Sequence, residues 1–142
     1  MKVMTLFIFT TISMFLGAQT QTHNHKHASD DHIAGLILND GHKWEMAPHM
    51  AKLINEMEHV LASSDHKSLS GLRSAGNQMK DLITKLVSGC SMVGPAHDNL
   101  HAFLSVYIPT VQQLVDVTNL EEADQVAKKL KVYFNAYNTH FE

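Results

Sequence analysis

The sequence predicts an all-α fold, an antiparallel up-down-up-down four-helix bundle with a short N-terminal helical turn. Apolar residues recur at alternating spacings of three and four after residue 47, which is typical of helices that bury one face. The connections between these segments are short, so neighbouring helices are expected to be antiparallel. With 142 residues and 44% hydrophobic content, the chain has enough apolar material for one domain with a core.

Helix-starting residues delimit the four segments. Pro48 and Pro95 are typical of a first helical turn, and residues 63–65 (SSD) are expected to form the turn and cap before the second helix. Asn119 with Glu122 resembles a capping pair that opens the fourth helix. The predicted core stripes are Met50, Leu53, Ile54, Met57 and Leu61; Leu69, Leu72, Gly76, Met79, Ile83, Leu86 and Cys90; His97, Leu100, Leu104, Ile108, Val111 and Val115; and Ala123, Ala127, Leu130, Phe134, Tyr137 and Phe141.

The N-terminal region divides into three parts. Residues 1–18 resemble a secretory signal peptide, with Lys2 before an apolar run that ends in small residues. Residues 19–32 are polar and carry His23, His25 and His27, followed by His32; this tail either captures metal ions loosely or is an inert linker. Residues 33–38 are expected to form the helical turn, so the bundle domain spans 33–142. We therefore expect a periplasmic or secreted protein with no membrane insertion after signal cleavage.

Composition excludes some classes of function. The net charge of −3 provides no basic footprint for nucleic acid. A single cysteine excludes an internal disulfide framework. The eleven histidines are the one clear excess, which draws attention to metal binding.

The predicted topology gathers candidate ligands at one end of the bundle. The start of the first helix, the end of the second, the start of the third and the end of the fourth should meet there. His97 and His101 are one helical turn apart, and the predicted stripe directs them inward. The residues expected at this end are Met46, His49, Met50, Cys90, Met92, His97, His101, Asn138 and His140, whereas only His59 and His66 are expected at the other.

This set of donors favours a soft or borderline metal. Thiolate and thioether ligands select Cu(I), and imidazole accepts Cu(II) or zinc. We expect Met50, Cys90, Met92, His97 and His101 to be the main ligands, with secondary contributions from Met46, His49, His140 and the tail histidines. Met57 and Met79 lie in the middle of their helices and are interpreted as packing residues.

Two strings carry a resemblance to a known family: residues 49–62 (HMAKLINEMEHVLA), and the C-terminal segment 123–142, which contains residues 135–141 (NAYNTHF). Both resemble cytochrome b562, a periplasmic four-helix bundle that holds b-type haem without covalent links. The resemblance implies that Met50 is an axial ligand, but Asn138 occupies the position of the axial histidine. Three further strings, residues 35–39, 41–44 and 90–97, resemble a group of exported proteins of Bacteroidetes-type bacteria.

Three functions remain open from the sequence. The first is a non-enzymatic exported protein that binds copper or a similar metal and exchanges it, or electrons, with a partner protein. The second is an electron carrier with non-covalent haem, held by Met50 and by His97, His101 or His140. The third is an enzyme with Cys90 as nucleophile and His97 or His101 as base, for which the sequence shows no third orienting group.

Overall fold

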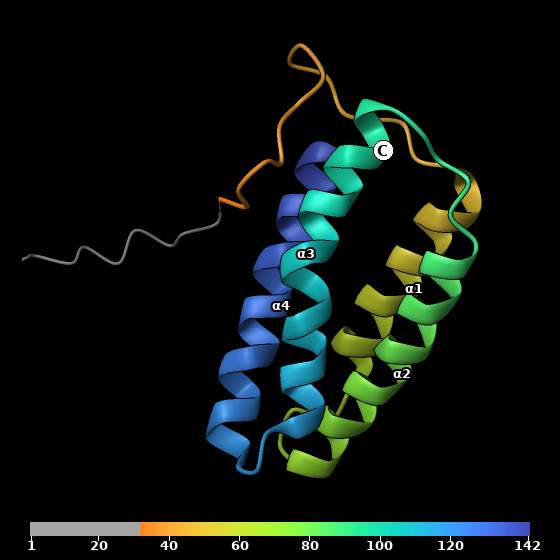
Figure 1. Ribbon diagram of the computed structural model, residues 1–142. Coiled ribbons are helices and arrows are strands. Elements are labelled where there is room, and N and C mark those ends of the chain that lie inside the picture. The colour runs from red at the N-terminus through yellow and green to blue at the C-terminus, as the bar shows by residue number, and fades with distance from the viewer. Residues whose placement is uncertain (1–31) are drawn as a thin grey trace, which may run out of the picture.

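The computed structural model describes residues 32–142, which contain four α-helices (Figure 1). Helix α1 spans Pro48–Ser63, α2 spans Leu69–Ser88, α3 spans Pro95–Asp116 and α4 spans Leu120–His140. The predicted all-α four-helix bundle is therefore confirmed. The proposed signal peptide and most of the polar tail lie outside the described residues.

The helix starts follow from local chemistry. Pro48 and Pro95 occupy the first turns of α1 and α3, where a proline costs no intrahelical hydrogen bond. Asn119 caps α4 as predicted, because its Oδ1 accepts a 2.8 Å bond from the Glu122 backbone N–H. The prediction that the cap of α2 lies within residues 63–65 is wrong. Ser68, rather than residues 63–65, caps this helix by accepting a 2.9 Å bond from the Gly71 N–H.

The core runs the length of the bundle, and its stripe on α3 differs from the predicted one. Phe103, Tyr107 and Leu114 are fully buried, whereas Ile108 is 37% exposed. The sequence left this stripe ambiguous because α3 carries apolar residues on more than one face. The aromatic rings of the core pack in contact, with centroids 4.9–5.4 Å apart, in the group Phe103, Tyr107, Phe134, Tyr137 and Phe141.

Residues 32–47, here called the strap, cross the end of the bundle before α1 (Figure 1). In place of the helical turn expected over 33–38, the strap has a β-turn closed by a bond from the Leu36 N–H to the Ile33 carbonyl, with Gly35 at φ 83°. A second tight turn pairs Asn39 with His42. Ile33 and Leu36 are buried, so the strap adds apolar contacts to this end of the core.

The strap is tied to both α3 and α4. The buried Asn99 side chain accepts a 2.8 Å bond from the Ile37 N–H, and the Trp44 indole N–H donates to the Ile37 carbonyl at 2.7 Å. Backbone bonds join Trp44 to His140 and Glu142, next to an isolated parallel bridge between Trp44 and Phe141. These bonds hold the part of the strap just before α1 against the C-terminal end of α4.

Contacts at the helix ends show which ends meet. His49 near the start of α1 bonds Gly89 after the end of α2, and Arg73 near the start of α2 bonds the Val115 carbonyl near the end of α3. Figure 1 shows consecutive helices running in opposite directions. Helix α1 packs mainly on α2 and only lightly on α4. Within the described residues, no helix combines the length and the apolar character needed to cross a membrane.

Candidate functional site

The two histidines near the start of α3 form a close pair. The Nε2 atoms of His97 and His101 lie 3.0 Å apart, and their rings are nearly perpendicular, with centroids separated by 4.3 Å. The spacing of four residues places both side chains on one face of the helix. Because imidazole nitrogens can bond in this way only if one donates and the other accepts, the pair shares a proton between two nitrogens that are potential metal ligands.

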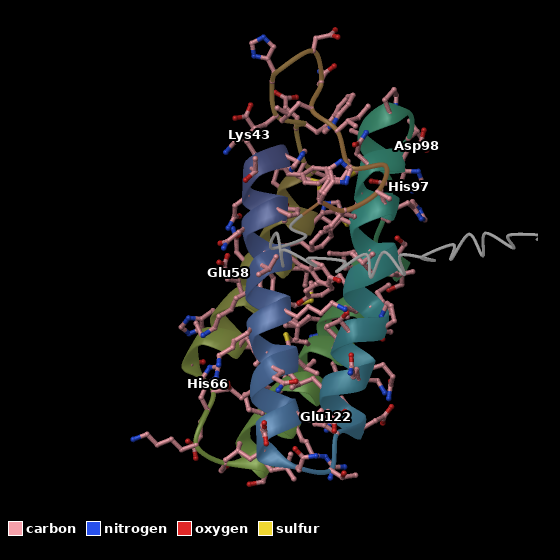
Figure 2. The ribbon with its side chains drawn as sticks, turned by 90° about the vertical axis from the view of Figure 1, so that its left-hand side faces the viewer. Lys43, Glu58, His66, His97, Asp98 and Glu122 are labelled. Atoms are coloured by element: carbon pink, nitrogen blue, oxygen red, sulfur yellow. The ribbon has the colours of Figure 1, made fainter. Side chains whose placement is uncertain are left out.

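The pair lies on the flank of the bundle and does not point into the core as predicted. His97 is half-buried and His101 is exposed. The physical reason is which face of α3 is buried. The buried stripe follows Leu100, Phe103 and Tyr107, so the face that carries the two histidines lies toward the edge of the bundle. Figure 2 labels His97 and Asp98 at the start of α3, on the side away from α4. The pair is therefore accessible from solvent.

Cys90 and Met92 lie on the connection between α2 and α3. The prediction that Cys90 ends the core stripe of α2 is wrong, because the helix ends at Ser88 and Gly89 follows as its C-cap. Both sulfur side chains are half-buried and pack against the core. Cys90 is a free thiol. This connection ends at Gly94, whose φ of 75° is a conformation that glycine adopts readily.

The remaining predicted ligands have different surroundings. Met50 is completely buried and Met46 nearly so, and both belong to the apolar core. His49 Nε2 donates to the Gly89 carbonyl at 2.9 Å, and His140 Nδ1 donates to the Ala136 carbonyl at 2.7 Å. A carbonyl only accepts, so each of these rings has its other nitrogen available. The tail residues His23, His25 and His27 lie outside the described residues.

The structure assembles two of the predicted ligands rather than a complete set. In the part of the chain that the structure describes, no group of three or more His, Cys, Asp or Glu side chains could hold a metal ion. The His97–His101 pair is nevertheless close to ligating geometry. Imidazole nitrogens bind zinc at about 2.0–2.1 Å, so two such ligands at a tetrahedral angle lie roughly 3.3 Å apart. A small rotation of either ring from the present 3.0 Å separation would reach that spacing.

The surroundings of Met50 do not fit a haem as they stand. Its side chain has no exposed surface, so a haem iron could reach the thioether only if the core around it were displaced. Asn138, which the resemblance to cytochrome b562 would align with the axial histidine of that family, is exposed and donates a 3.5 Å bond to Glu58 Oε2. The Nδ1–H of His140 donates to the Ala136 carbonyl in its own helix.

Sequence reasoning missed a polar contact in the core. The Tyr107 hydroxyl lies within hydrogen-bonding distance of two sulfur atoms, those of Met57 at 3.7 Å and Met79 at 3.5 Å, and its single O–H can donate to either. The interpretation of Met57 and Met79 as packing residues is confirmed, since both are completely buried in the core. Burial, followed by the negative charge of Glu58, raises the pKa of Tyr107 well above its usual value. The missing signal was the correct stripe on α3, which would have placed Tyr107 on the buried face of that helix.

Comparisons with known proteins returned no match, whether to a family model, to a curated protein or to a solved structure.

Proposed function

We propose that the protein is an exported, non-enzymatic metal-binding bundle that holds copper or a similar soft or borderline ion at the start of α3. The observation that carries this proposal is the 3.0 Å approach of the His97 and His101 Nε2 atoms on an accessible helix face. Imidazole pairs at this spacing along a helix are a common way to present two nitrogen ligands to one ion. A metal ion would replace the shared proton between the rings.

Two ligands do not complete a coordination shell, and the α2–α3 connection offers the next donors. Cys90 and Met92 precede His97 by seven and five residues, on a segment with glycines at both ends. In this proposal the connection shifts toward the histidine pair when the ion binds, which adds soft sulfur ligands for Cu(I). The tail histidines add weak capture, and a second protein delivers or removes the ion.

Haem remains the alternative, with less support. It rests on the resemblance of residues 49–62 to the cytochrome b562 string and on Met50 in particular. The buried state of Met50 and the outward position of Asn138 count against it. A nucleophilic role for Cys90 has no supporting contact, because no hydrogen bond joins its thiol to a histidine among the described residues.

Copper titration of purified protein tests the proposal. We expect His97→Ala and His101→Ala each to lower the affinity for Cu(I) and Cu(II) by at least about tenfold, since loss of even an outer-shell partner costs about 10–100-fold. Cys90→Ser should weaken Cu(I) more than Cu(II), because the thiolate is the soft ligand. Binding should also raise the melting temperature, since only the folded chain assembles the ligands.

The matched control is His59→Ala, which removes an exposed helical histidine far from the pair along the chain. It should leave the tight site unchanged, and removal of residues 19–32 should abolish only weak binding. Unchanged tight binding in both His97→Ala and His101→Ala would contradict the proposed site. A dominant effect of Met50→Ala with haem as the added ligand would favour the alternative.

A further inference from the structure

The His97–His101 pair supplies two nitrogen ligands, which is half of the tetrahedral shell that zinc takes in proteins. Within residues 32–142, no third His, Cys, Asp or Glu side chain joins the pair to form a group that could hold a metal ion. Recruitment of Cys90 and Met92 for Cu(I) requires the α2–α3 connection to move. An ion that accepts imidazole needs no such movement if a second copy of the chain supplies the other two nitrogens.

The helix face that carries the pair is accessible and continues beyond it. Ser105 and Ile108 follow His101 by four and seven residues, so they lie on the same face of α3. Ser105 is exposed, and its hydroxyl already donates to the Ala102 carbonyl at 2.7 Å. Figure 2 shows His97 on the side of α3 away from α4. Another molecule can therefore reach both imidazoles along this face.

Helix α3 carries few charges compared with its neighbour in the bundle. Its Asp and Glu, Lys and Arg residues are limited to Asp98 and Asp116, near its two ends, whereas α4 has six such residues in a similar length. Depletion of charged residues is the compositional mark of the centre of protein interfaces. Asp98 is the charge nearest in sequence to the pair, and its negative sign favours a cation there. The composition of α3 thus suits close approach of a second chain around a metal ion.

We propose that two copies of the chain meet at this face and that their four histidines together bind one zinc ion. The inference rests on the metal site proposed above and names its partner. A two-fold axis through the ion brings the same patch of both chains together, which is the commonest symmetry of homo-oligomers. The Nε2 atoms of one chain lie 3.0 Å apart, and a tetrahedral zinc site needs roughly 3.3 Å. Each chain therefore contributes one edge of the tetrahedron.

The ion is needed because the apolar contact on this face is small. Ile108, at 37% exposure, is the one exposed large hydrophobic residue of α3. Stable protein interfaces bury about 1,200–2,000 Å² in total, which a short stretch of one helix face does not provide. The chain should therefore be a monomer without metal and a dimer with zinc, and a chelator should reverse the association.

Sedimentation velocity of the purified chain at increasing zinc concentration tests the proposal. The mass should double at one zinc ion per two chains and return to that of the monomer at a large excess of zinc, because each pair then takes its own ion. His97→Ala and His101→Ala should each abolish the dimer. A chain that binds zinc at the pair but stays monomeric at every ratio would overturn the dimer and leave the metal site intact. Absence of both zinc and copper binding would overturn both.

Surface variants separate the dimer face from the ligands. Ser105→Arg places a long charged side chain one turn after His101, where it would meet its own copy across the two-fold axis. It should abolish the zinc dimer and leave Cu(I) binding unchanged. Gln113→Arg is the matched control, because Gln113 is exposed on a different face of the same helix. Equal loss of the dimer in both variants would overturn the proposed face.

Two further variants test whether other ligands bridge the copies. Removal of residues 19–32 and the substitution Cys90→Ser should each leave the zinc dimer intact, because neither changes the four histidines that hold the ion. Loss of the dimer in the shortened chain would assign the bridge to the tail histidines, and loss in Cys90→Ser would assign it to the thiol. Either result would overturn the four-histidine site.

Discussion

Phe103→Ala is expected to lower the free energy of unfolding by about 3–5 kcal/mol, as truncation of a buried phenylalanine does. The Phe103 ring has no exposed surface and packs at 5.1 Å on Tyr107 and 5.4 Å on Tyr137. Its removal would leave a cavity between α3 and α4 that these rings cannot fill without losing their own contacts. Chemical denaturation followed by circular dichroism measures the change.

The control for this prediction is Ile108→Ala on the same helix. Ile108 is 37% exposed, so its truncation should cost less than about 1 kcal/mol. The comparison distinguishes the two possible stripes on α3, because the stripe predicted from sequence contains Ile108 and omits Phe103. A larger loss for Ile108→Ala than for Phe103→Ala would show that the observed phase of α3 is wrong.

Leu86→Ala should lower the free energy of unfolding by about 2–5 kcal/mol. Leu86 is fully buried in the last two turns of α2, near the end of the bundle that the strap covers. Its neighbour Val87 is 55% exposed, so Val87→Ala should change stability by no more than about 0.5 kcal/mol. The same denaturation measurement applies. Equal effects of the two substitutions would mean that the stripe on α2 is misplaced.

The sequence predicted the four helices well because their start signals are local. A proline in the first turn or an Asn119 cap depends on residues within one turn, and the structure places both as expected. The stripe on α2 was also predicted correctly from Leu72 to Leu86, because polar residues occupy most of the other positions; Ala75 and Leu82 are buried beside it. Helix α3 is apolar on more faces, so spacing alone admitted two stripes.

The strap and the candidate site depended on contacts that no local signal reveals. Ile33 and Leu36 are buried where the strap is held by the buried side chain of Asn99. Asn99 lies 62 residues further along the sequence than Ile37, whose N–H it accepts. The approach of His97 to His101 followed directly from their spacing. The position of the two histidines relative to Cys90 could not be predicted, because it depends on whether α2 continues past Ser88 and on which face of α3 is buried.

The most direct test of metal binding at the start of α3 is metal analysis, together with an absorption spectrum, of protein isolated from its native compartment. We expect about one copper or similar ion per chain in the wild type, and a clear loss of that ion in a variant that carries both His97→Ala and His101→Ala. The spectrum should lack a Soret band. A Soret band in the wild type, or the same metal content in the double variant, would contradict the proposed site.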